Sequence, residues 1–195
     1  MTASPTTKTA VLFFATLAVI SVSFALAVWH HDDPDARVEF RLTSHTGDTL
    51  TARDLGGRHL MVFFGFTSCH NICPAQMNKL TRVMSELDQS GHGTRIKPVF
   101  ISVDPERDTP AKVAAYLEYF DDRFVGLTGS RTALERAAAS FRTLFEDLPA
   151  ELTADHQINH STVVYIVDPF SRIVDYLPGS ADHRQMAARI RRLSP

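Results

Sequence analysis

Cysteine is scarce in this sequence, and a surplus of basic residues is absent. The chain has 195 residues with two cysteines, 20 lysines and arginines, and 22 aspartates and glutamates, so its formal net charge is −2. Without a basic surplus there is no electrostatic footprint for nucleic acid, and we expect no nucleic-acid partner. The sequence also lacks internal repeats and low-complexity segments. The composition, 44% hydrophobic and 22% charged, is that of one globular domain plus an apolar segment.

The apolar segment covers residues 10–29, which include no charged residue. Twenty apolar positions match the thickness of a bilayer core. Lys8 precedes the segment, and Asp32, Asp33 and Asp35 follow it. The positive-inside bias therefore places the N-terminus in the cytoplasm and the rest of the chain outside, which divides the chain into four parts. These are a cytoplasmic N-terminus (1–9), a transmembrane anchor (10–29), a linker (30–37) and an exported domain (38–195). A cleaved signal peptide is the alternative, because residues 25–27 resemble a cleavage site.

The compartment follows from the same end of the chain. The N-terminus lacks the arginine-rich amphipathic character of a mitochondrial transit peptide. We therefore expect a single-pass protein of a bacterial inner membrane, with its domain in the periplasm.

Hydrophobic periodicity after the linker alternates between strands and helices. Strands are predicted at residues 38–43, 60–66, 98–103, 124–127, 162–167 and 173–177, and residues 48–51 are predicted to pair back as a hairpin. Helices are predicted at residues 74–90, 110–120, 130–141 and 180–193, with Ser180 as the cap of the last one. Residues 145–159 look like a loop. This alternation predicts an α/β domain with a mostly parallel central sheet that ends in a hairpin.

Both cysteines follow the apolar run at residues 60–66. Cys69 and Cys73 come just before Pro74, a residue favoured at the first position of a helix. Side chains four residues apart share one helix face, so the two sulfurs can form a disulfide or point at one metal ion. A structural disulfide here would enclose only a short loop and constrain little of the unfolded chain. The position therefore favours a working dithiol over a pair of structural cysteines.

Histidine supplies a candidate third donor. His160 directly precedes the strand predicted at residues 162–167, and it reaches the dithiol edge of the sheet only if that strand runs antiparallel. His156 lies four residues earlier, and that spacing also suits a metal site. Two other features, Met77 and Met84, fit the buried stripe of a helix, so core packing is favoured over metal binding for both.

Three blocks of sequence together resemble the Sco/SenC family. They are residues 64–74, which hold both cysteines, then residues 103–110, with the sequence VDPERDTP, and then residues 160–162 running to Asp168-Pro169. The resemblance covers about residues 38–193. It implies a thioredoxin-like fold and a membrane-anchored copper-binding protein that assists assembly of the copper site of cytochrome c oxidase. The implied partners are the copper-bearing oxidase subunit and other periplasmic copper carriers or thiol reductants.

The resemblance also implies the site. Cys69 and Cys73 match the two thiolate ligands of the family and form its redox disulfide, and His160 matches the imidazole ligand. Soft thiolates select Cu(I), and imidazole suits copper in either oxidation state. The sequence departs from the family at His70-Asn71, where Pro-Asp is usual, at Asn159, where Asp is common, and at Ser171, where Gly is common. The first two changes put copper affinity and thiol potential in doubt more than the ligand set.

Three functions compete. The first is copper binding and delivery, without enzymatic activity. The second is thiol–disulfide exchange on the cysteines of the copper-receiving subunit, although no proline lies between Pro149 and Pro169, where thioredoxins place one beside their dithiol. The third is a redox or copper sensor, which the same site would serve. Peroxidase activity is not expected, because the active-site threonine of peroxiredoxins would fall at Phe66.

Overall fold

The computed structural model describes residues 14, 16–23, 37–148 and 158–194, which fall into two units, Met1–Ala36 and Arg37–Pro195. In the first unit residues 16–23 are helical, and side chains such as Leu17 and Ile20 are exposed. Across the described ranges no helix has both the length and the apolarity needed to cross a membrane. Most of the anchor predicted at residues 10–29 lies outside the described residues.

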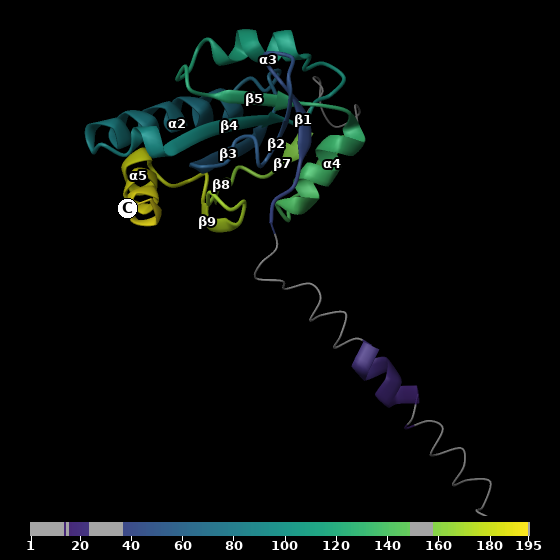
Figure 1. Cartoon of the computed structure of the whole chain (residues 1–195). Coiled ribbons are helices and arrows are strands. Elements are labelled where there is room, and N and C mark those ends of the chain that lie inside the picture. The colour runs from purple at the N-terminus through teal and green to yellow at the C-terminus, as the bar shows by residue number, and fades with distance from the viewer. Residues whose placement is uncertain (1–13, 15, 24–36, 149–157, 195) are drawn as a thin grey trace, which may run out of the picture. The chain divides into compact units, whose positions relative to one another are not determined.

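The second unit is built on a seven-stranded sheet with the order β2-β1-β5-β4-β3-β8-β9 (Figure 1). Its strands are β1 (Arg41–Ser44), β2 (Thr49–Thr51), β3 (His59–Gly65), β4 (Ile96–Ser102), β5 (Val125–Thr128), β8 (Val164–Val167) and β9 (Ile173–Leu177). The helices are α2 (Ile72–Gln89), α3 (Pro110–Leu117), α4 (Arg131–Ser140) and α5 (His183–Leu193), with a short 3-10 turn at Gly93–Arg95. The strands and helices that hydrophobic periodicity predicts are therefore present, with shifts of a few residues at their ends.

The sheet is mixed, so the prediction of a mostly parallel sheet is wrong. Strand β3 runs parallel to β4, and β4 runs parallel to β5. The other four pairings, β1 with β2, β1 with β5, β3 with β8 and β8 with β9, are antiparallel. Short connections such as the turn at Gly47, whose φ is 96°, favour antiparallel hairpins at both edges of the sheet. Only the centre has the helix-containing connections that parallel strands need.

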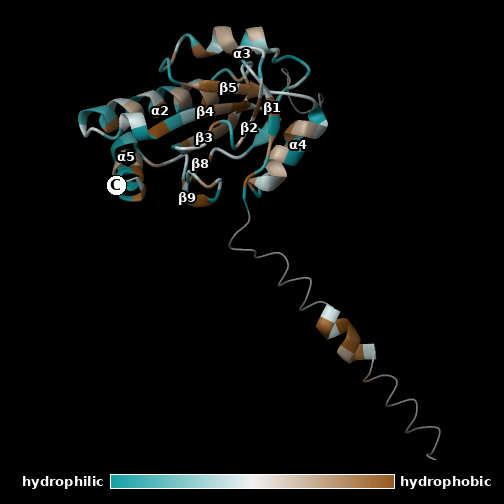
Figure 2. Ribbon diagram, viewed as in Figure 1, coloured by the Kyte–Doolittle hydropathy of each residue, from teal (hydrophilic) through white to brown (hydrophobic). Residues whose placement is uncertain are grey.

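Helices cover both faces of the central strands. Phe63 and Phe100 are register partners on one face, and α3 packs there because Val113 and Leu117 lie over Gly126, the partner of Phe100 on β5. On the other face Phe64 contacts Phe141, which follows α4. Figure 1 shows α2 and α5 side by side, with α4 on the opposite side of the sheet. Figure 2 shows hydrophobic residues concentrated on β3, β4 and β5 between these layers, as expected for strands buried on both faces.

Two helix starts differ from the prediction. Helix α2 begins at Ile72 rather than at Pro74, and its N-cap Asn71 makes no capping hydrogen bond with its side chain. Helix α5 is capped by Asp182 rather than by Ser180, because the Asp182 carboxylate accepts from the N–H groups of Arg184 and Gln185 while Gln185 reaches back. This reciprocal capping box satisfies more orphan donors than a serine two residues earlier.

Residues 145–159 are not wholly a loop. Strands β6 (Phe145–Asp147) and β7 (Ile158–His160) form a separate antiparallel pair, in which Phe145 is the register partner of His160. Three-residue strands leave too short an alternation to be detected from sequence. The pair matters because it fixes the backbone on which His160 lies.

Candidate metal centre

The two cysteines lie where the buried strand β3 gives way to α2. Cys73 is fully buried on the first turn of α2, whereas Cys69 is partly exposed in the preceding loop, and both are free thiols. The Cys73 N–H points at the Cys69 sulfur, with an N···Sγ distance of 3.4 Å. The first N–H groups of a helix have no intrahelical acceptor, so this sulfur takes the place of the missing cap.

His160 reaches the cysteines because β8 runs antiparallel to β3. Val164 at the start of β8 is the register partner of Phe63, so the chain just before β8 lies beside the end of β3. The condition that the sequence set for His160 is thus met. Its ring sits between two phenylalanines, with centroid distances of 6.1 Å to Phe63 and 5.7 Å to Phe66, and both contacts are edge-on.

The imidazole presents its acceptor nitrogen to the dithiol. His160 Nδ1 lies 3.0 Å from the Ser161 carbonyl, which can only accept, so Nδ1 carries the proton. The other nitrogen, Nε2, lies 3.5 Å from the Cys73 sulfur although 87 positions separate the residues. Metal–sulfur and metal–nitrogen bonds of about 2.3 and 2.05 Å would subtend this separation at an angle of roughly 107°. The pair is therefore spaced as two ligands of one ion.

Cys69 would have to move in order to join Cys73 and His160 around one ion. In the part of the chain that the structure describes, no three His, Cys, Asp or Glu side chains already form a group able to hold a metal ion. Cys73 and His160 stand at ligand spacing, so binding an ion requires an adjustment of the Cys69 side chain. Cys69 lies in a loop and is partly exposed, which leaves its side chain the freedom to do so.

Glycine makes room for the buried sulfur. A Cβ atom on Gly65 would lie 3.2 Å from the Cys73 sulfur, 3.1 Å from Phe63 and 2.8 Å from the Phe100 ring. All three contacts are closer than side chains normally tolerate, so the absence of a side chain here lets Cys73 approach the strand. A lone glycine inside an apolar strand is a sequence signal for such an approach.

Burial keeps the metal-free site neutral. Burial raises the pKa of the Cys73 thiol to about 12, a backbone hydrogen bond with Phe66 opposes the rise, and the negative charge of Cys69 adds to it. Burial lowers the pKa of His160, opposed by its hydrogen bond to Ser161. At neutral pH the site therefore holds a protonated Cys73 thiol and an uncharged imidazole. A metal ion has to displace the thiol proton, so binding releases a proton and weakens as pH falls.

Asp108 braces the loop in front of Cys69. This buried carboxylate accepts from the Thr67 N–H at 2.8 Å, from the Thr67 hydroxyl at 2.6 Å and from the Ser102 hydroxyl at 2.6 Å. It joins the loop after β3 to the loop after β4. Asp104 and Arg107 form a neighbouring ion pair at 2.6 Å and add no contact to the cysteines.

Several other candidates stay apart from the dithiol. His70 is exposed, and Asn159 is exposed as well. Met77 and Met84 are fully buried core residues, which confirms the packing interpretation. His156 lies outside the described residues.

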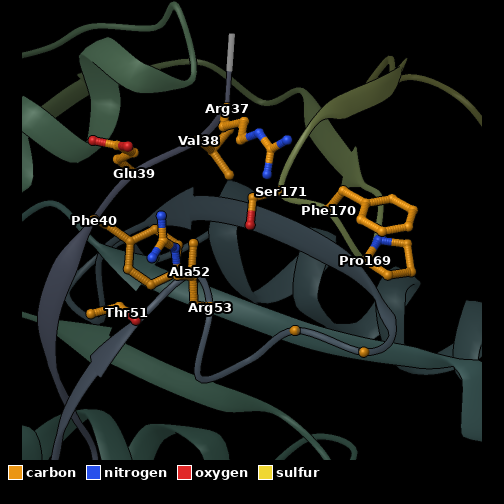
Figure 3. A pocket seen from close by; sticks show the side chains of 12 residues that line it. Arg37, Val38, Glu39, Phe40, Thr51, Ala52, Arg53, Pro169, Phe170 and Ser171 are labelled. Carbon is orange, nitrogen blue, oxygen red and sulfur yellow. The ribbon is translucent and has the colours of Figure 1, made fainter. Parts of the chain in front are cut away.

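A cavity of about 530 Å³ lies elsewhere, between the segment before β1, the residues at and just after the end of β2, Gly56-Gly57 and the turn from β8 to β9 (Figure 3). Arg37, Phe40, Arg53 and Phe170 are among its lining residues, and neither cysteine nor His160 lines it. This cavity is therefore separate from the cysteines and His160.

The fold and the site together define a thioredoxin-like domain with two free thiols at a helix start and an imidazole beside them. Comparison with known families agrees, since the family model described as SCO1/SenC matches residues 30–194. The chain belongs to the SCO1/SenC family.

Known relatives and solved structures are consistent with this assignment. The "Protein SCO2 homolog, mitochondrial" of Danio rerio is 39% identical over 153 residues, which cover 78% of this chain and 55% of that protein. The human "Protein SCO1 homolog, mitochondrial" is 34% identical over 151 residues, covering 77% and 50%. The chain thus spans about half the length of these relatives. A crystal structure of Arabidopsis thaliana ScoI with copper bound has a TM-score of 0.74 at 32% identity, covering 80% of this chain and 95% of that one.

Proposed function

We propose that this protein is a membrane-anchored copper chaperone that binds one copper ion through Cys69, Cys73 and His160. The observation that carries the proposal is the 3.5 Å separation between the Cys73 sulfur and His160 Nε2. A spacing suited to a shared ion would not be expected of an imidazole that only packs against phenylalanines. The copper-bound state of the related Arabidopsis structure supports the choice of ion.

The protein's own residues divide the work. Two thiolates supply soft ligands that favour Cu(I), and the neutral imidazole nitrogen is compatible with both oxidation states. With three protein ligands, one coordination position stays open for a donor on the receiving protein. Ser161 holds the imidazole in the tautomer that leaves Nε2 free. The chaperone has no catalytic residue in this account, and copper is its cargo.

The recipient and the location are parts of the same proposal. Following the family resemblance, the recipient is the copper-bearing subunit of cytochrome c oxidase, reached directly or through other periplasmic carriers. The domain faces the periplasm of a bacterium, anchored by residues 10–29 in the inner membrane. The uncharged stretch 10–29 supports the anchor, as do the exposed apolar side chains on its described helical part.

Copper binding is tested with the full chain in its reduced form, wild type against His160→Ala. We expect one Cu(I) per chain, and an affinity at least about 100-fold weaker in the variant, since loss even of an outer-shell partner costs 10- to 100-fold. His70→Ala is the matched control, because it removes an exposed histidine between the cysteines, and it should bind as wild type. Equal affinity of all three proteins would refute a ligand role for His160.

Thiol–disulfide exchange is the second candidate, favoured by the two free thiols at a helix start. In that reaction the reduced pair would pass two electrons to a partner disulfide and itself become the Cys69–Cys73 disulfide. Reductase activity that is unchanged in His160→Ala, in a protein that retains no copper, would establish this function instead.

A further inference from the structure

One buried polar group near the dithiol has no partner in the described structure. The Tyr116 hydroxyl on α3 is shielded from solvent, and no donor or acceptor among the described residues meets it. A buried hydroxyl without a partner has lost its hydrogen bonds to water without replacing them, which costs stability. Such a group in a folded protein therefore calls for an explanation, and a ligand-dependent partner is one.

Aromatic packing brings the Tyr116 ring up to the site. The ring lies 5.5 Å from the Phe100 ring and 5.0 Å from the Phe120 ring, measured between centroids. Phe100 in turn meets the same point above Gly65 that the Cys73 sulfur meets, at 2.8 and 3.2 Å respectively. One phenylalanine thus stands beside both Tyr116 and the buried sulfur, on the sheet face that α2 and α3 share.

The rest of α3 confirms that this helix borders the dithiol loop. Lys112, one turn before Tyr116, has its ammonium 3.5 Å from the Ser68 hydroxyl, directly before Cys69. The electrostatics agree, since the pKa of Tyr116 is raised first by burial and then by the charges that Cys73 and Cys69 carry when they are deprotonated and by the charge of Asp108. The phenol is thus within electrostatic reach of both sulfurs in its protonated, donating form.

We propose that Tyr116 is a positioning residue of the metal centre, whose hydroxyl donates a hydrogen bond to a thiolate of the Cys69–Cys73 pair in the metal-bound state. The inference rests on the proposed copper function. Two thiolates and Cu(I) carry one net negative charge, and a buried donor compensates for that charge where water is absent. The metal-free thiols, which are weak acceptors, leave the donor unmet, as the structure has it.

Tyr116→Phe removes only the hydroxyl and keeps the ring contacts. Tyr119→Phe is the matched control, because Tyr119 lies on the solvent side after α3 with 82% exposure. Four quantities are measured on the full chain. They are the Cu(I) affinity by competition with a chromophoric chelator, the energy of the thiolate-to-Cu(II) charge-transfer band, the midpoint potential of the metal-free dithiol, and the thermal stability of the metal-free protein.

We expect Tyr116→Phe to bind Cu(I) about three- to tenfold more weakly and to shift the charge-transfer band, as loss of one hydrogen bond to a ligand would. The metal-free variant should be as stable as wild type or more stable, because a buried unmet hydroxyl is gone. If the bond also forms to the reduced thiols, the midpoint potential falls by up to about 30 mV, the equivalent of tenfold for two electrons. An unchanged potential beside a weakened affinity places the bond in the metal-bound state alone, as proposed.

Unchanged affinity and band energy relative to Tyr119→Phe would overturn the proposal, as would a loss of metal-free stability that accounts for the whole loss in affinity. Failure of the copper function itself is distinguishable. If wild type retains no Cu(I), the proposed function is refuted. A midpoint potential of the dithiol that is unchanged in Tyr116→Phe would then refute the proposed hydrogen bond as well.

Discussion

Asp108 is the side chain whose removal should most disturb the loop that carries Cys69. Its carboxylate accepts three short hydrogen bonds, two from Thr67 and one from Ser102, inside the protein. Hydrogen bonds to a charged group contribute about 1.5–3 kcal/mol each, but the two hydroxyls can rotate toward other acceptors. The Thr67 N–H cannot rotate. We therefore expect Asp108→Ala to lower the free energy of unfolding by about 1.5–3 kcal/mol, the contribution of the one bond that cannot be replaced.

The isosteric variant should cost less. In Asp108→Asn the amide oxygen can keep the two bonds that Oδ2 accepts, and the amide nitrogen can donate to the Thr67 hydroxyl. Only the charge assistance is lost, about 1–2 kcal/mol. Glu106→Ala is the control, because Glu106 lies in the same loop with its side chain 74% exposed, and its effect should stay within about 0.5 kcal/mol.

Urea unfolding followed by circular dichroism measures the three free energies. We expect the order Glu106→Ala, Asp108→Asn, Asp108→Ala from mildest to most severe. A destabilisation below about 1 kcal/mol in Asp108→Ala would refute the bracing role, since the Thr67 N–H would then have found another acceptor.

Three further predictions concern other positions. Gly65→Ala should lower the unfolding free energy by about 1–3 kcal/mol through overpacking against Cys73, and should weaken Cu(I) binding. Gly91→Ala, where no atom lies near the added carbon but φ is 75°, should lower the unfolding free energy by about 1 kcal/mol through backbone strain alone and leave Cu(I) binding unchanged. Ser171→Gly should raise the unfolding free energy by up to about 1 kcal/mol, because Ser171 has a φ of 67° in the left-handed region; a midpoint in urea equal to or below that of wild type would contradict this. Burial would raise the pKa of Asp121, but its hydrogen bonds and ion pair with Arg123 outweigh burial and lower this pKa. The lowered pKa contributes stability that is present above the unfolded pKa near 3.8 and is lost as pH falls through the lower folded pKa. Unfolding free energies measured from about pH 6 down to about pH 2 should therefore fall more steeply for wild type than for Asp121→Asn, and parallel curves would count against this linkage.

Local patterns predicted most of the elements, because each is set by nearby residues. The run at residues 60–66 is apolar on both faces, so it became β3 at the centre of the sheet. Thr109 and Ser130 cap α3 and α4, since each side chain accepts from an N–H three residues ahead. The sequence also showed that His160 could reach the cysteines only if the strand that follows it ran antiparallel, because that requirement depends on the direction of a single strand.

Long-range geometry was beyond the sequence. The three-residue strands β6 and β7 pair across a gap that no periodicity signals, and the antiparallel edges of the sheet depend on which strands meet. The buried hydroxyl of Tyr116 looks like any helix-face aromatic until its surroundings are known. The hydrogen bonds between Thr67 and Asp108 likewise join two loops that are 41 positions apart in the sequence.

Because Cys73 and His160 are 87 positions apart, they are synthesised at different times in a chain that is made from its N-terminus. Both sulfurs emerge well before the imidazole does, and they meet it only after β8 has docked against β3. An incompletely synthesised domain therefore presents two thiols but no imidazole nitrogen to copper, and its thiols can be oxidised before His160 reaches them. Copper binding by Cys69, Cys73 and His160 together should accordingly be the last step of maturation. A reductant that keeps the two thiols reduced would be needed before the metal.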